Sequence, residues 1–183
     1  MYEKFGQFID GKWSPSENKE TYEVINPATE EVIGQASKAT SGDVERALKS
    51  AEKGLQIWKK TPPWQRSYIL RKIADKMREK KDVLAKWMTL ENGKPLAEGV
   101  AETNGAADIF EWNAEETKRI YGQTVESRFE DTRVHVFYQP VGVVAALSPW
   151  NFPLVLAARK IATALGAGCS VIIKPDVITP GVV

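Results

Sequence analysis

Four residues of this sequence could take part in chemistry: Asn151, Lys174, Cys169 and His135. The side-chain amide of Asn151 could donate to a developing oxyanion, and the Lys174 ammonium could meet phosphate or ribose hydroxyls. An asparagine between Trp and Phe-Pro is more often a turn or cap residue, and a lysine is more often a solvated surface side chain. Residue type alone leaves both interpretations of Asn151 and Lys174 open.

The single cysteine and the single histidine are weaker candidates. Cys169 directly precedes an apolar segment and has no histidine near it in the sequence, so we expect a buried, inert thiol rather than a nucleophile. His135 is the single histidine, which excludes a histidine-rich metal site, and its place in an alternating strand segment gives no convincing Ser–His–Asp set. One cysteine allows no internal disulfide and favours a reducing compartment, so we expect a cytoplasmic protein.

The elements that must position Asn151 and Lys174 form a strand–helix–strand unit. Residues 141–147 and 171–173 are apolar runs of strand length, typical of parallel strands buried on both faces. An apolar helix is predicted between them, over residues 154–165. Such a βαβ unit, with a right-handed crossover, places the turns after both strands at one edge, where open α/β sheets bind ligands.

The glycines of this unit do not form the usual dinucleotide fingerprint. No G-x-G-x-x-G follows the first strand, and Gly166-Ala167-Gly168 lies at the end of the helix. There the glycines are typical of a C-cap that allows a tight turn into the next strand. On this motif alone, nucleotide binding is only a weak inference.

The residues before this unit are predicted to form short strands, then helices, then strands again. An Asp-Gly turn predicts a hairpin over residues 8–13, and Thr40 with Asp43 suits a helix start. The tryptophans that fall on the helical apolar stripes are interpreted as core residues. The predicted strands cover residues 22–25 and 31–37, the predicted helices cover 40–58, 63–92 and 95–121, and an alternating sheet segment with two unlike faces covers 123–140.

Composition excludes some classes of partner. The hydrophobic fraction is 43% and the net charge is +1, with no long run of like charges, which argues against nucleic acid and acidic membrane surfaces. No apolar run approaches the ~20 residues of a membrane span.

Two buried parallel strands need neighbours, so we expect more strands to follow and the chain to be a piece of a longer product, rather than a small domain with a frayed tail.

Several motifs together resemble one family, the NAD(P)-dependent aldehyde dehydrogenases, and among them most closely the succinate-semialdehyde dehydrogenases. The resemblance covers essentially the whole chain in order. It rests on F-I-D-G-K-W at 8–13, I-N-P-A-T at 25–29, E-N-G-K-P-L at 91–96, A-E-E-T-K-R-I-Y-G at 114–122, Q-P-V-G-V-V at 139–144, P-W-N-F-P at 149–153, K-P at 174–175 and T-P at 179–180.

The resemblance implies an α/β fold class: the N-terminal part of the family's Rossmann-like cofactor domain. Residues 1–122 would be the first part of that domain, and 123–140 an oligomerisation hairpin. Residues 141–183 would be the first βαβ of the dinucleotide-binding fold, truncated. The expected partners are a small-molecule aldehyde, NAD or NADP, and further copies of the full-length chain in a dimer or tetramer.

The resemblance also implies a reaction. In the family a cysteine thiolate attacks the aldehyde, hydride leaves to NAD(P), and water hydrolyses the thioester to the acid. The nucleophile and the general-base glutamate lie beyond Val183, and Cys169 does not match the nucleophile's motif, so we expect this chain alone to be inactive. The alternatives are a shortened paralogue that acts as an oligomerisation or regulatory partner, a general aldehyde dehydrogenase, and an unrelated βαβ nucleotide-binding module.

By the same resemblance, individual residues acquire roles. Asn151 would donate to the oxyanion, Phe152 would line the aldehyde tunnel, and Arg159 would meet a substrate carboxylate or serve as a structural surface arginine. Many relatives carry an aromatic residue at the position of Arg159. The nicotinamide half would contact Ser148, Pro149, Trp150 and Asn151, and the adenosine ribose Lys174, Pro175, Asp176 and Val177.

One departure from the family bears on cofactor choice. Many relatives have a glutamate at the position of Val177, where it contacts the ribose hydroxyls and repels a 2′-phosphate. Its absence leaves NADP open, although Asp176 nearby could act against the phosphate. We therefore hypothesise dual or NADP-leaning use.

Overall fold

The computed structural model describes residues 6–183. Its first strands, β1 (Gln7–Ile9) and β2 (Lys12–Ser14), form an antiparallel hairpin. Asp10 and Gly11 both have positive φ in its turn, as a two-residue hairpin of right-handed twist requires. A second hairpin joins β3 (Thr21–Ile25) to β4 (Val32–Ser37). The sequence prediction of both strand pairs is confirmed.

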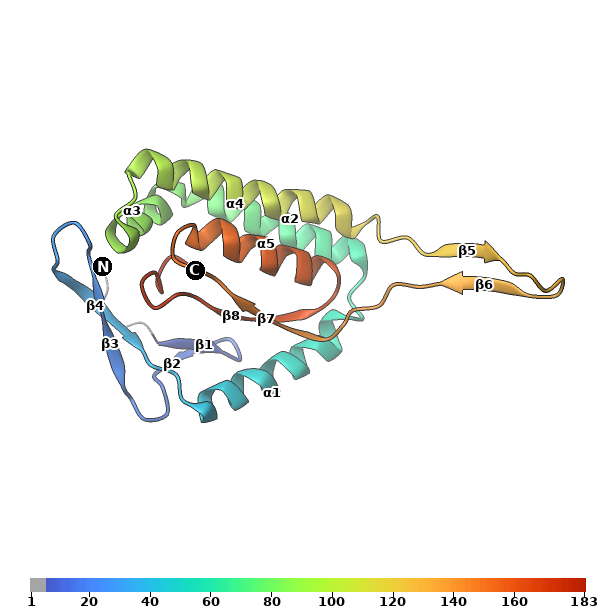
Figure 1. The fold of residues 1–183 in the computed structure, drawn as a ribbon, viewed down its shortest axis with the longest axis horizontal. Helices are drawn as coiled ribbons and strands as arrows, with labels where there is room; N and C mark the ends of the chain where they lie inside the picture. The colour runs from blue at the N-terminus through green and yellow to red at the C-terminus, as the bar shows by residue number, and fades with distance from the viewer. Residues whose placement is uncertain (1–5) are drawn as a thin grey trace.

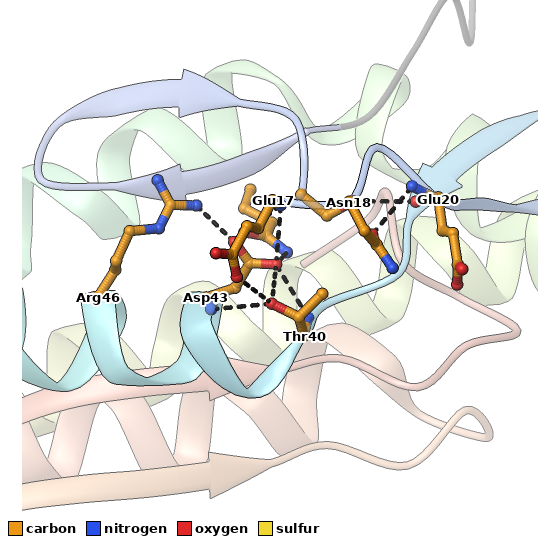
Figure 2. A network of polar contacts seen from close by, with 8 residues as sticks. Glu17, Asn18, Glu20, Thr40, Asp43 and Arg46 are labelled. Carbon is orange, nitrogen blue, oxygen red and sulfur yellow. Dashed lines mark hydrogen bonds and ion pairs between the residues drawn. The ribbon is translucent and has the colours of Figure 1, made fainter.

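The predicted helix start at Thr40 is also confirmed. Thr40 caps α1 (Ser41–Trp58): its Oγ1 accepts from the Asp43 N–H at 3.2 Å, and the Asp43 carboxylate accepts from the Thr40 N–H at 2.9 Å. Figure 2 shows that the same carboxylate accepts from the backbone N–H of Glu17 and from Arg46. Because Asp43 is buried, this network ties the 15–20 loop to the first turn of α1.

The predicted helix over residues 63–92 is wrong as a single element. It consists of α2 (Pro63–Glu79) and α3 (Lys81–Asn92), with Lys80 at φ −101° and ψ 13° between them. Lys80 is neither proline nor glycine, and the apolar spacing continues across it from Met77 to Leu84. The apolar pattern of the sequence therefore gives no sign of the break, although the structure divides this segment into two helices that both pack against α4.

The next helix, α4 (Leu96–Thr117), ends four residues before the predicted Tyr121. It lies against α2, α3 and α5 (Pro153–Gly166), and these helices enclose the main core. The buried part of this core contains Leu70, Ala74, Met88, Ala106, Ala107, Phe110, Ala114, Leu154, Ala158, Ala162 and Val182. Two stripe tryptophans are half-buried: Trp58 donates its Nε1–H to the Leu165 carbonyl at 2.8 Å, and Trp87 packs against the core.

The segment over residues 123–140 forms a hairpin that projects from the rest of the molecule, as Figure 1 shows. Its strands are β5 (Gln123–Glu126) and β6 (Arg133–Val136), and the second strand stops before the predicted Tyr138. Every strand residue is exposed, so the expectation of two unlike faces is wrong in this chain. A two-stranded ribbon that extends away from the body has no neighbouring element to bury either face.

The last unit is the predicted βαβ: β7 (Val143–Leu147), α5, and β8 (Ser170–Lys174), with the strands parallel. In Figure 1, α5 lies on one side of this pair of strands and α1 on the other. The expectation that the strands are buried on both faces is wrong here: Ala146 and Ser170 are buried, while Leu147 is exposed. A two-stranded sheet leaves both of its edges open, and the covering helices reach only part of it.

Candidate functional site

The turns after β7 and β8 lie together, as the βαβ pattern predicts. Leu147 pairs with Lys174 in register, and the Ser148 N–H donates to the Lys174 carbonyl at 3.1 Å. Ser148 is buried, and its Oγ donates to the Pro153 carbonyl at 2.9 Å. The structure thus brings together residues 148–153 and 174–177, the two segments assigned to the site from sequence.

Asn151 lies in the first of these turns with its side chain exposed. Its amide has no hydrogen-bond partner within residues 6–183, so both of its N–H groups are available to a ligand. Its backbone carbonyl, in contrast, accepts from Lys94 Nζ at 3.1 Å. The preceding Trp150 is half exposed, and its carbonyl accepts from the Asn92 amide at 2.8 Å.

Sequence reasoning missed the pair that supports this turn. Lys94 lies between α3 and α4, Glu102 lies on α4, and the two side chains form a buried ion pair. Glu102 Oε1 accepts from the N–H groups of Leu154 and Val155, at 3.0 and 3.1 Å. Those amides belong to the first turn of α5, whose N-cap residue supplies no side-chain cap.

This capping has a chemical consequence. The N-terminus of a helix after a first parallel strand is where many α/β folds bind a phosphate. Here the Glu102 carboxylate already occupies the amides of Leu154 and Val155. The absence of a glycine fingerprint and the presence of this carboxylate agree that the first turn of α5 is not a phosphate site.

The second turn presents the Lys174 side chain to solvent. Asp176 Oδ1 accepts from the Ile178 N–H at 3.0 Å, which closes a local turn, and Val177 is exposed. Burial raises the pKa of Tyr22, and the charge of Asp176 raises it further, so the Asp176 carboxylate lies near β3. Asp176 is therefore held by its own turn, while Lys174 and Val177 face outward.

The remaining candidates lie in three different places: on the surface of α5, within the first turn and in the interior. Arg159 is exposed on α5, and its guanidinium has no hydrogen bond or ion pair among the residues that the structure describes. Phe152 is half exposed at the N-cap of α5, and the Lys94 ammonium lies 4.1 Å from its ring centre. Cys169 is buried with 3% of its surface exposed, as expected for an inert thiol.

A second buried carboxyl lies close to the chain after β8. Glu91 is fully buried, and its Oε1 accepts from the Gly181 N–H at 2.8 Å, while Oε2 has no partner within residues 6–183. Burial raises the pKa of Glu91 to about 8, against the opposing effect of the backbone hydrogen bonds. Glu91 opens the E-N-G-K-P-L motif, but nothing near it in the sequence predicts this hydrogen bond, because the partner is 90 positions away.

Comparison with known proteins decides the family. The sequence profile described as "Aldehyde dehydrogenase family" matches residues 13–183. The chain belongs to the aldehyde dehydrogenase family. This confirms the resemblance drawn from the motifs and removes the alternative of an unrelated nucleotide-binding module. No helix within residues 6–183 is both long and apolar enough to cross a membrane.

Several curated relatives are semialdehyde dehydrogenases. A glutarate-semialdehyde dehydrogenase of Pseudomonas aeruginosa is 44% identical over 173 residues, which are 94% of this chain and 36% of that protein. The succinate-semialdehyde dehydrogenase [NADP(+)] of Escherichia coli is 42% identical over 172 residues, with the same two shares. The aldehyde dehydrogenase chain thus spans about a third of the length of these relatives.

Solved structures agree with this α/β fold. An E. coli NADP-dependent enzyme has a TM-score of 0.95 and 41% identity, over 97% of this chain and 37% of that one. A betaine aldehyde dehydrogenase of Staphylococcus aureus, solved with NAD+, has a TM-score of 0.92 and 39% identity, over 96% of this chain and 36% of that one. The fold class predicted from sequence is confirmed.

Proposed function

We propose that the protein of which this chain forms a part oxidises an aldehyde to the carboxylic acid with NAD or NADP. The observation that carries the proposal is Asn151: a free side-chain amide on a backbone held in place, at the joined carboxyl ends of two parallel strands. A preorganised N–H donor of this kind stabilises the oxyanion that forms when a nucleophile adds to an aldehyde carbonyl.

The surrounding residues fit a nicotinamide cofactor by their chemistry. Trp150 offers a half-exposed aromatic surface beside Asn151, and Lys174 offers an exposed ammonium at the neighbouring strand end. When bound, the cofactor would supply the acceptor for the hydride that leaves the former carbonyl carbon after a nucleophile has added to it. Ser148, Pro149 and Trp150 would then contact its nicotinamide half, and residues 174–177 its ribose.

The test uses a chimeric enzyme in which this chain replaces the matching 36% of the E. coli succinate-semialdehyde dehydrogenase. Asn151→Ala should lower kcat by roughly 100-fold with little change in KM, because the amide acts on the transition state. Asn104→Ala on α4, whose side chain is also an amide, is the matched control and should keep its activity. Equal kcat in the Asn151 variant and the parent would refute the role.

We further propose that the 183 residues by themselves do not turn over an aldehyde. The reaction needs a nucleophile, and Cys169, the residue directly before β8, is buried. A thiol reagent should therefore label Cys169 only after unfolding. Aldehyde-dependent NADH or NADPH formation by the purified chain would overturn this proposal.

The proposed substrate is a semialdehyde acid. Support comes from the named relatives and from Arg159, an exposed and unpaired guanidinium eight residues after Asn151. An arginine binds a carboxylate through two parallel hydrogen bonds. In the chimeric enzyme, Arg159→Ala should raise KM for succinate semialdehyde about tenfold, the cost of one such hydrogen-bonded charge, and leave KM for an uncharged aldehyde unchanged. Lys160→Ala, which removes the neighbouring exposed charge, is the matched control and should leave both KM values unchanged. An unchanged KM for succinate semialdehyde in Arg159→Ala would favour a general aldehyde dehydrogenase.

Dual or NADP-leaning cofactor use is part of the same proposal. Val177 is exposed and uncharged, so the position where many relatives carry a glutamate has no charge to repel a 2′-phosphate. Asp176 keeps its negative charge nearby, with Oδ1 bound to the N–H of Ile178. Val177→Glu in the chimeric enzyme should weaken NADP more than NAD. A hundredfold preference of the parent for NAD would contradict the proposal.

We also propose that the β5–β6 hairpin joins subunits of the full-length protein. Its exposed Val125, Val134 and Val136 leave apolar surface without cover in this chain. Light scattering of the chimeric enzyme should show a dimer or tetramer that Val134→Asp disrupts. If the chain were instead a shortened paralogue that acts as a partner, it would co-purify with a longer family member. The cytoplasmic location stays a prediction.

A further inference from the structure

We infer that Lys94 and Glu102 are positioning residues for Asn151: as a buried ion pair they fix the backbone at that residue and in the helix turn that follows it, and so aim its amide. The functional half of this inference rests on the proposed function. Its structural half, the control of the Asn151 conformation, does not.

Lys94 makes three contacts with its buried ammonium. Its ammonium has three N–H groups, and the side chain is only 5% exposed. Nζ donates to Glu102 Oε2 and to the Asn151 carbonyl, the latter at 3.1 Å, and lies 4.1 Å from the centre of the Phe152 ring. Each of these three contacts is with the α4 carboxylate or with the turn that carries Asn151.

Both carboxylate oxygens of Glu102 accept hydrogen bonds. Oε2 accepts from Lys94, and Oε1 accepts from the amides of Leu154 and Val155. The carboxylate thus fixes Leu154 in the first turn of α5, and the ammonium fixes Asn151, three positions before Leu154. Phe152 and Pro153, which link the two, have little freedom left.

The ion pair binds the backbone of Asn151 and not its side-chain amide. The backbone carbonyl of Trp150 accepts a hydrogen bond from Asn92, and that of Asn151 accepts one from Lys94. The side-chain amide of Asn151 has no hydrogen-bond partner within the described chain. A hydrogen-bond donor works on a transition state only when its direction is set in advance. The ion pair supplies that direction without touching a substrate.

Removing one partner of a buried pair leaves an unpaired charge, so stability alone is a poor readout. We therefore compare Lys94→Met, Glu102→Gln and the double variant in the chimeric enzyme. Each single variant should lower the Tm and lower kcat by about 10- to 100-fold, with KM nearly unchanged. The double variant holds no unpaired charge, and its Tm should recover toward the parent.

The double variant separates positioning from stability. Its glutamine can still accept from Leu154 and Val155, but the Asn151 carbonyl has lost its donor, so kcat should stay low while the Tm recovers. A merely structural pair would regain both, and that result would overturn the inference. Lys76→Met, which breaks the exposed pair of Lys76 with Glu79, is the matched control and should change neither value.

A direct readout on the 183-residue chain does not depend on catalysis. In the ¹⁵N-labelled protein, the side-chain amide signals of Asn151 should shift or broaden in Lys94→Met and stay in place in Lys76→Met. Unchanged Asn151 signals in Lys94→Met would also overturn the inference. An inactive parent chimera would count against the proposed function, and the Asn151 signals would then decide the positioning role alone.

Discussion

The backbone N–H of Ser148 donates to the carbonyl of Lys174 at 3.1 Å, so the first residue after β7 is bonded to the last residue of β8. This bond extends the parallel pairing by one position beyond the strand. It also brings the turn that carries Asn151 to the turn that begins at Lys174. The relative position of the two halves of the candidate site therefore depends on Ser148.

The Ser148 side chain should contribute measurably to this arrangement. Ser148→Ala removes the buried bond from Oγ to the Pro153 carbonyl and should cost about 1 kcal/mol of unfolding free energy. Urea unfolding measures the difference. Ser127→Ala is the control, because the Ser127 Oγ accepts from Phe129 on the exposed hairpin and its loss should matter less. Equal losses in both variants would contradict the account of Ser148.

Gly168 should not tolerate a side chain. Its φ is +91°, and an added Cβ would lie 2.9 Å from Pro140 Cγ. Gly168→Ala should therefore destabilise the protein by roughly 1–3 kcal/mol through backbone strain and the contact with the proline ring.

The comparison for this variant is a glycine in an ordinary helical position. Gly54 lies inside α1, and an added Cβ there meets nothing within 4 Å. Gly54→Ala should stabilise the protein by about 0.5–1 kcal/mol. Thermal unfolding of the two variants should give shifts of opposite sign, and a shift of the same sign would refute the conformational argument.

Asp43 should make stability fall in acid. Burial alone would raise the pKa of Asp43, but hydrogen bonds from the Thr40 N–H, from Arg46 and from the Glu17 N–H outweigh it and hold the pKa well below its ordinary value. A carboxyl with a lowered folded-state pKa contributes stability above its ordinary pKa of about 3.9 and loses it as the pH falls.

Asp43→Asn tests this dependence. Loss of the charge-assisted bonds should cost at least about 2 kcal/mol at neutral pH, and the variant should lose less further stability below pH ~4 than the parent. Denaturant unfolding across that range measures both effects. Asp75→Asn, at an exposed position of α2, should behave like the parent. A parent whose acid sensitivity matches that of Asp43→Asn would show that another group is responsible.

Glu91 should make stability fall as the pH rises, whereas Asp43 makes it fall as the pH drops. Because burial raises its pKa to about 8, the folded protein keeps a proton that the unfolded chain releases near the ordinary value. Stability is then greatest below the ordinary pKa, and declines as the pH rises toward 8 by up to about 1.4 kcal/mol per pH unit. Glu91→Gln removes this titration, so its unfolding free energy should change less between about pH 5 and 8. Glu98→Gln, an exposed carboxyl on α4, should keep the slope of the parent; a flat parent profile would count against a protonated Glu91.

Much of the local structure was predictable because its causes are local. The Asp-Gly turn needs positive φ at Asp10 and Gly11, and the Thr40–Asp43 capping box is closed within four residues. The apolar runs around Asn151 and Lys174 predicted the parallel strands and the place where their turns meet. The break at Lys80 was not predictable, because no residue there opposes a helix and the apolar spacing continues across it.

The sequence by itself determined the family, the order of elements, and which residues stand at the two strand ends. Only the tertiary structure decided how Asn151 is held. Lys94 reaches a carbonyl 57 positions away, and Glu102 caps a helix that begins 51 positions after it. Neither contact has a periodicity or spacing to reveal it. Burial makes the pair decisive, because two opposite charges removed from water must find every partner within the fold.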